Sequence, residues 1–128
     1  MNDKIHKALG IFLDAMRPFV VSFLQQHFPN EPWEGLFFAR LKPARQTTWN
    51  QAMRAQGENQ SCMYFIDYNN LPDFAIGFKR ELGLEFENLD KANKFISYLQ
   101  ELKDIRNKCN HYQALDNEEI EGAYLYIK

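Results

Sequence analysis

The sequence has few of the residues that build several common kinds of functional site. Only two of its 128 residues are cysteines, Cys62 and Cys109, and their separation matches neither zinc-ligand spacing nor a disulfide-rich scaffold. We expect both to be buried thiols in a reducing compartment. The six glycines form neither a phosphate-binding loop nor a nucleophile elbow. The sequence therefore predicts no metal site and no cofactor.

Long hydrophobic runs and a large excess of charge of one sign are also missing. The longest apolar run, PFVVSFL at residues 18–24, is too short to cross a membrane, and the acidic residues near the N-terminus do not suit a signal peptide. The formal net charge is −2, so any nucleic acid must be bound by a local basic patch. With 45% hydrophobic residues, the chain is expected to form one domain over residues 1–128, located in the cytoplasm.

Helical periodicity runs through almost the whole sequence. Apolar residues recur at steps of four and three from Ile5 to Phe23, which predicts a long amphipathic helix. Pro18 predicts either a kink in this helix or two helices that meet near Arg17. Shorter helices are predicted at residues 34–41, from 47 or 48 to 57, and at 70–82, with Gly83 ending the last of them. Residues 58–70 are expected to be irregular, with either a short strand or a helical turn in CMYFIDY.

A second long helix is predicted to begin at Asn88 or Asp90. It places one apolar stripe on the core side, made of Phe95, Leu99, Leu102, Ile105 and Cys109. A final helix is expected to begin near Asp116 and still to run at Lys128, without a stop signal, which is the pattern expected if the chain is the front part of a longer protein. The predicted fold class is all-α, a helical bundle with two long helices and several short ones.

The second long helix ends in a polar stretch, KDIRNKCNHYQ at residues 103–113. Around a straight helix, Arg106 lies about 40° from Leu102, and His111 lies about 140° further round. Arg106 and His111 can therefore cooperate only if the helix frays before His111, or if a second copy of the chain supplies half of the site. Composition alone favours a solvated helix end, because an Arg–His spacing of this kind arises by chance in roughly one chain of this size in three.

The residues around this stretch make a stronger pattern than the spacing alone. Arg106, Asn107 and His111 resemble the signature of the HEPN family (higher eukaryotes and prokaryotes nucleotide-binding domains), in which an arginine, a polar residue and a histidine end a long helix. The chain is most similar to the Swt-type HEPN subgroup. Further elements of that subgroup follow in the right order, namely AMRPFVVSFL, NEPWEGL, the pair Trp49 and Asn50, and the acidic stretch DNEEIEGAYLYI.

Two features depart from the resemblance. The subgroup usually has Ala or Trp-Ala before the histidine, where this chain has Cys109 and Asn110. Another HEPN branch has a tyrosine two residues after the histidine, whereas Tyr112 follows here immediately. The chain therefore resembles the Swt-type subgroup and not that second branch.

The resemblance implies a metal-independent endoribonuclease, often part of a phage-defence or toxin–antitoxin system, whose site forms where two domains meet. It implies attack by the 2′-OH of RNA and a 2′,3′-cyclic phosphate product. In that assignment His111 is the general acid/base, and Arg106 binds the scissile phosphate and stabilises its charge. Asn107 orients the phosphate or the histidine. The implied partners are RNA, a second copy of the chain, and an antitoxin or an ATPase.

Other residues are weaker candidates for contacts with RNA. They are Lys103, Lys108, Asn110 and Tyr112 beside the motif, and Arg45 and Arg54 in the segment 39–57, which has four cations and no acid. Within that segment Trp49 is better interpreted as a core residue and the cations as solvated. The two other histidines, His6 and His27, have no neighbouring ligand partners in the sequence and are expected at the surface.

Two other functions stay open. The first is a non-catalytic HEPN domain that serves as an RNA-sensing or dimerisation module of an ATPase or helicase system, although the retained Arg106, Asn107 and His111 argue against it. The second is a helical adaptor unrelated to RNA, in which the motif is a coincidence. Replacement of His111 separates these from a ribonuclease, because only a ribonuclease loses cleavage while it keeps its fold.

Overall fold

The computed structural model describes residues 2–56 and 62–110. Within these two ranges the chain forms six α-helices and one 3-10 turn, and no strand. The elements are α1 (Asn2–His27), α2 (Trp33–Ala39), α3 (Pro43–Gln56), η1 (Cys62–Phe65), α4 (Leu71–Gly77), α5 (Lys79–Glu85) and α6 (Leu89–Asn110). The predicted all-α bundle with two long helices and several short ones is confirmed.

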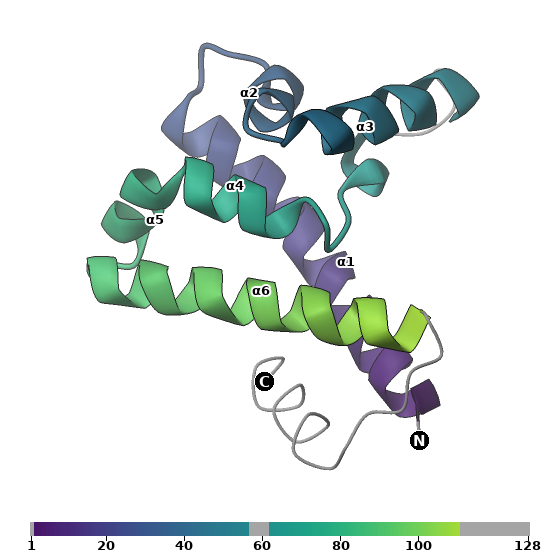
Figure 1. Ribbon diagram of the computed structural model, residues 1–128. Helices are drawn as coiled ribbons and strands as arrows, with labels where there is room; N and C mark the ends of the chain where they lie inside the picture. Colours follow the sequence, from purple (N-terminus) through teal and green to yellow (C-terminus); the bar gives the residue numbers. More distant parts are fainter. Residues whose placement is uncertain (1, 57–61, 111–128) are drawn as a thin grey trace.

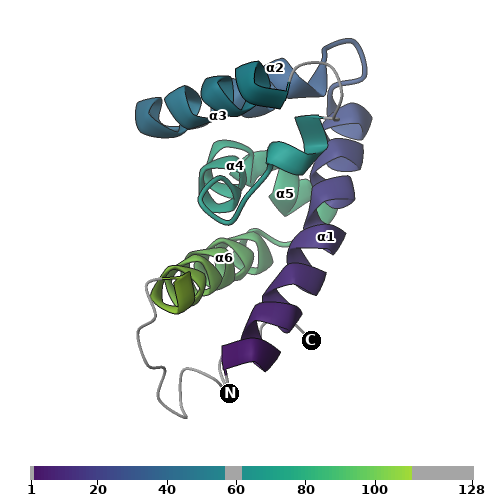
Figure 2. The ribbon, with the colours of Figure 1, turned by 90° about the vertical axis from the view of Figure 1, so that its right-hand side faces the viewer.

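The helices lie in three layers beside α1. In Figure 2, α2 and α3 form one outer layer, α4 and α5 the middle layer, and α6 the other outer layer, while α1 runs along one side of all three. Figure 1 shows α6 passing under α4 and α5. α1 contacts α2, η1 and α6. This arrangement brings the segment after η1 within reach of both long helices.

Aromatic side chains fill the space between the layers. Phe74 of α4 is fully buried, with its ring centroid 5.7 Å from that of Phe23 in α1 and 6.0 Å from that of Phe37 in α2. Trp49 of α3 lies 5.3 Å from Phe37 and is only 4% exposed. The interpretation of Trp49 as a core residue is therefore confirmed.

The apolar stripe predicted for each long helix is its buried face. In α1, Ile5, Leu9, Met16 and Phe23 are buried, and in α6 the stripe from Leu99 to Cys109 is buried, with Phe95 partly covered. By length and composition alone α1 could also cross a membrane, with a mean hydropathy of 1.3 over its most apolar window. Core helices of soluble proteins share this property, and the buried stripe of α1 belongs to the core cluster.

Of the two alternatives predicted for Pro18, the meeting of two helices near Arg17 is wrong, because α1 runs unbroken from Asn2 to His27. The predicted start of α3 is also wrong. α3 begins at Pro43 and not at Thr47 or Thr48. A proline suits the first position of a helix, where its missing N–H leaves no hydrogen bond unmade. The carboxylate of Asp73 in α4 also accepts a hydrogen bond from the backbone N–H of Lys42 at 3.2 Å, which supports the start of α3.

The single helix predicted at residues 70–82 is in fact two short helices, α4 and α5, with Phe78 between them. The backbone N–H groups of Phe78 and Leu82 still donate to the carbonyls four residues earlier, so the break is a local bend. Gly77 ends α4, and a Cβ there would approach the Arg40 side chain to 2.8 Å. The guanidinium of Arg40 lies 5.1 Å from the Phe78 ring centroid. The helix therefore bends where Arg40 crosses a residue without a side chain.

The prediction that Gly83 ends a helix is wrong, because Gly83 lies inside α5. The helix ends at Glu85 in a Schellman motif, because the N–H of Asn88 donates to the carbonyl of Gly83 and the N–H of Glu87 to that of Leu84. Glu87 holds the left-handed conformation of this motif, with φ 59°. The side chain of Asn88 then accepts a hydrogen bond from the N–H of Asp90 at 2.7 Å, which confirms Asn88 as the start of α6.

The segment expected to be irregular contains η1, so the helical-turn alternative for CMYFIDY is correct and the strand alternative is wrong. The final helix predicted from Asp116 lies outside the described residues.

Candidate functional site

Arg106 lies near the end of α6 and reaches the segment that follows η1. Its Nη2 donates to Oδ2 of Asp67 at 3.1 Å, and its guanidinium carbon lies 5.8 Å from the ring centroid of Tyr68. The Arg106 side chain is 16% exposed, against 40% for Asp67. Its Nε is buried and has no hydrogen-bond partner among the described residues. The predicted position of Arg106 at the edge of the buried stripe is thus confirmed, and its charge is already paired.

The segment that carries Asp67 is also fixed from α1. Arg17 donates from Nε to the carbonyl of Ile66 at 3.0 Å and from Nη2 to that of Tyr64 at 3.2 Å. Within the segment, the side chain of Asn70 accepts a hydrogen bond from the N–H of Asp67 at 2.8 Å. Asp67 is therefore held in place before any ligand binds.

Tyr68 connects the same segment to the core. Its hydroxyl donates to the backbone carbonyl of Leu9 in α1 at 2.6 Å, and the side chain is buried. Burial raises the pKa of the Tyr68 hydroxyl well above its ordinary value, and the positive charge of Arg106 only partly opposes this. Tyr68 is therefore a neutral hydrogen-bond donor that supports the aromatic face under Arg106.

Replacing Tyr68 by phenylalanine is expected to lower the free energy of unfolding by about 0.5–1.5 kcal/mol near neutral pH, because one buried hydrogen bond is lost. The wild type should also lose stability as the pH rises above 10.0, the ordinary pKa of tyrosine, since the unfolded chain then releases a proton that the folded chain keeps. Tyr68→Phe should lose less over that range. Urea denaturation below and above pH 10 measures both effects, with Tyr64→Phe, at a half-exposed tyrosine, as the control.

A small cavity next to this ion pair holds about 100 Å³. Its walls come from α3, the end of η1 and the segment before α4, and they consist of Arg45, Thr48, Trp49, Ala52, Phe65, Asp67, Asn69 and Asn70. Asp67 both lines the cavity and pairs with Arg106. Asp67 therefore connects the cavity, whose lining includes Arg45, with Arg106, which does not itself line the cavity.

The structure brings together only some of the predicted RNA-binding residues. Lys103, Asn107 and Lys108 are partly exposed on the last turns of α6. Arg54 is exposed and follows Arg45 by nine residues, which places it about 180° away around α3 and off the cavity. His111 and Tyr112 lie outside the described residues, as does the side chain of Asn110.

Asp67, Asn69 and Asn70 belong to the site but were not among the residues predicted for it. Their signal was the polar run at the end of CMYFIDYNN, which directly follows the aromatic residues of η1. A carboxylate and two amides in such a place favour either turn formation or ligand contacts. Asn70 serves the turn, since its side chain bonds the backbone of Asp67, whereas Asp67 faces Arg106.

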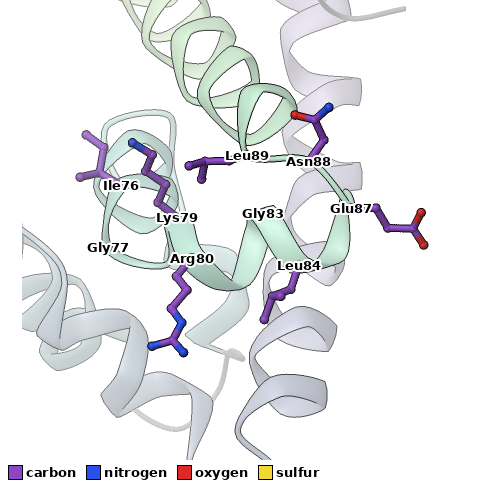
Figure 3. A pocket seen from close by; sticks show the side chains of 9 residues that line it. All are labelled: Ile76, Gly77, Lys79, Arg80, Gly83, Leu84, Glu87, Asn88 and Leu89. Atoms are coloured by element: carbon purple, nitrogen blue, oxygen red, sulfur yellow. The ribbon is translucent and has the colours of Figure 1, made fainter.

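A larger cavity of about 910 Å³ lies at the other end of α6. Figure 3 shows Leu89 at the start of α6 reaching toward Ile76 and Lys79, with Glu87 pointing away. The cavity has none of the motif residues in its lining. Leu89 precedes Arg106 by 17 residues, or about 25 Å of helix, so this surface is separate from the Arg106 site.

Two expectations about single residues need correction. His27 is partly buried and not a simple surface residue, with Nε2 3.2 Å from Oε2 of Glu85 and its ring 4.4 Å from that of Phe23. His6 is exposed as expected. Cys109 is buried as predicted, whereas Cys62 is only partly buried. In the described ranges no group of three or more His, Cys, Asp or Glu side chains could hold a metal ion.

The fold and the site define an all-α domain that presents an arginine, supported by an acid and an aromatic ring, near the end of a long helix. The sequence profile of the Swt1-like HEPN family matches residues 7–128. The chain therefore belongs to the Swt1-like HEPN family, and the resemblance read from its motifs is confirmed. This family membership indicates a ribonuclease-type or nucleotide-binding module, and HEPN domains often bind RNA and dimerise. No curated protein and no solved structure matches the chain.

Proposed function

We propose that the protein is a metal-independent endoribonuclease of the HEPN type that acts in the cytoplasm as part of a phage-defence or toxin–antitoxin system. The observation that carries this proposal is the setting of Arg106 in a member of this family. A fixed guanidinium near the end of α6, partly open to solvent, is suited to a phosphate group. The pairing with Asp67 and the contact with Tyr68 restrict its orientation.

In the proposed reaction the 2′ oxygen of one nucleotide attacks the adjacent phosphorus and the bond from phosphorus to the 5′ oxygen breaks. His111 takes the proton from the 2′-OH or returns one to the leaving 5′ oxygen, because imidazole exchanges protons near neutral pH. The products are a 2′,3′-cyclic phosphate and a free 5′-OH. No metal ion is needed, since the nucleophile belongs to the RNA itself.

Arg106 stabilises the negative charge that develops on the phosphate oxygens. Its Nη2 is bonded to Asp67, so the phosphate approaches the remaining Nη1 edge of the guanidinium. Asp67 acts as a positioning residue that fixes the plane of this group. Asn107, the next residue on α6, orients the phosphate or the histidine.

The proposed active enzyme is a homodimer with a composite site. On a continuous helix His111 would lie about 140° round from Arg106, so the two side chains of one chain would face different directions. A second copy of the chain supplies the missing half when two α6 ends meet. An antitoxin or an ATPase is the expected type of regulator.

A second candidate function is a non-catalytic HEPN module that senses RNA or dimerises within an ATPase or helicase system. The ion pair between Arg106 and Asp67 favours this alternative, because a phosphate has to compete with a carboxylate for the guanidinium. Such a module binds RNA without cutting it.

The decisive experiment is incubation of the purified chain with a mixed RNA pool in excess EDTA, with Arg106→Ala purified in parallel. The proposal predicts cyclic phosphate ends from the wild type and none from the variant, whose fold and oligomeric state are checked by circular dichroism and light scattering. A requirement for a divalent metal, or equal cleavage by Arg106→Ala, would contradict the mechanism. Binding of RNA without cleavage would support the second candidate.

A further inference from the structure

The cavity beside the Arg106–Asp67 pair has a size and a lining that suit one flat ring. Its volume is about 100 Å³, and Trp49 and Phe65, which pack edge to face against each other with ring centroids 5.8 Å apart, form its apolar wall. A closed cavity of about 150 Å³ in another protein is known to hold benzene. The cavity in this chain is smaller but partly open, so it suits one six-membered ring better than a fused pair of rings.

The polar side of the cavity offers a buried hydrogen-bond acceptor. Asn69 lines the cavity, and its Oδ1 is buried and has no hydrogen-bond partner among the described residues. An unpaired buried acceptor costs free energy, which a donor on a ligand would recover. Because Oδ1 is buried, Asn69 has to rotate its amide about its terminal torsion, which is soft, for the oxygen and nitrogen to meet a ligand in the cavity.

The position of the cavity connects it to the phosphate site. Asp67 lines the cavity and holds Arg106, and Arg45 contributes a second cation to the cavity wall. A nucleotide with its base in the cavity would therefore meet Arg45 in the cavity wall and Asp67, the residue that holds Arg106. Arginine provides the planar donor pattern that phosphates prefer.

We propose that this cavity binds one unpaired pyrimidine base of the RNA substrate, with Asn69 reading its Watson–Crick edge. Cytosine and uracil both present an N–H next to an acceptor, so one amide can bond either of them. Single-stranded RNA is commonly recognised in this way, with an unstacked base bonded on its edge inside a protein pocket. The inference rests on the proposed function for the statement that the bound RNA is also cut.

The test uses a matched pair of substitutions on α3 in the full chain. Ala52→Leu fills the cavity, whereas Ala55→Leu adds the same side chain at an exposed position outside the cavity lining. Cytidine 3′-monophosphate, adenosine 3′-monophosphate and ribose 5-phosphate are titrated into isotope-labelled protein, and the indole N–H of Trp49 and the side-chain amide of Asn69 are followed by NMR.

The proposal predicts that the cytidine nucleotide shifts both signals and binds more tightly than the other two probes. Ala52→Leu should weaken its binding by roughly tenfold or more, as for an obstructed apolar pocket, while Ala55→Leu binds like the wild type. Asn69→Ala should reduce the difference between the cytidine and adenosine nucleotides. Unmoved Trp49 and Asn69 signals, or equal effects of the two leucine variants, would overturn the proposal.

Cleavage mapping separates this inference from the proposed function. A wild type that cuts next to pyrimidines and an Asn69→Ala variant that cuts without that preference would support both. If the chain binds cytidine 3′-monophosphate in the cavity but cuts no RNA, the proposed function is wrong and the base pocket stands. If it cuts RNA with a base preference that neither Ala52→Leu nor Asn69→Ala changes, the pocket is wrong and the nuclease stands.

Discussion

Replacing His111 by alanine is expected to lower the rate of RNA cleavage by roughly 10²–10⁴-fold, the usual contribution of a positioned acid or base. The fold should persist, since the described residues 2–56 and 62–110 supply a large buried core cluster. Single-turnover cleavage of one labelled RNA, with the variant in excess, measures the rate without interference from product release. A rate within twofold of the wild type would remove His111 from the mechanism.

A site composed of residues from two chains can be tested by mixing two inactive variants. His111→Ala and Arg106→Ala chains are each expected to be inactive alone, but subunit exchange between them creates mixed dimers with one intact site. Because about half of randomly formed dimers are mixed and one of their two sites is intact, activity should return to about a quarter of the wild-type level. No recovery after proven subunit exchange would show that both residues act within one chain.

Replacing Phe74 by alanine is expected to lower the free energy of unfolding by about 3–5 kcal/mol. Phe74 is fully buried and its ring lies within 6.0 Å of the rings of Phe23, Phe37 and Phe78, so its loss leaves a cavity where three helices and the α4–α5 bend meet. Urea denaturation gives the change in stability from the shift in midpoint at constant slope.

Ile76→Ala on the same helix is the matched control. Ile76 is 53% exposed, so its replacement should change the free energy of unfolding by no more than about 0.5 kcal/mol. A loss for Phe74→Ala as small as that for Ile76→Ala would mean that the centre of the core lies elsewhere.

The sequence predicts the two long helices well because their apolar residues follow the helical period over many turns. Ile5 to Phe23 in α1 and Leu99 to Cys109 in α6 each require one buried face, and no competing pattern satisfies them. The bend at Phe78 was not predicted, and it coincides with a contact that the local pattern does not show, since Arg40 lies far away in sequence and packs over Gly77 and the Phe78 ring. Similarly, the left-handed conformation after α5 belongs to Glu87, although a glycine usually takes it. For this reason Gly83 was the better candidate for the end of the helix in the sequence.

The candidate site was also predictable only in part from the sequence. Arg106 and His111 could be proposed from the sequence because, with Asn107, they resemble the signature of the family to which the chain belongs. The partner of Arg106 was not predictable, because Asp67 precedes it by 39 residues and belongs to a segment without periodicity. Only the packing of α1, η1 and α6 brings the two charges together.

The contacts of Arg106 also determine when its site can form during folding. Asp67 is 39 positions away from it, and the Tyr68 ring under its guanidinium is anchored 59 positions further back, at Leu9. Closing loops of this length costs chain entropy that only the docked helices recover. A peptide of residues 89–111 would carry the motif without the contacts that position Arg106, and a nascent chain would acquire an ordered Arg106 only after its helices have packed onto one another. Such late assembly would keep a potential RNA-cutting site unformed while the protein is still being made.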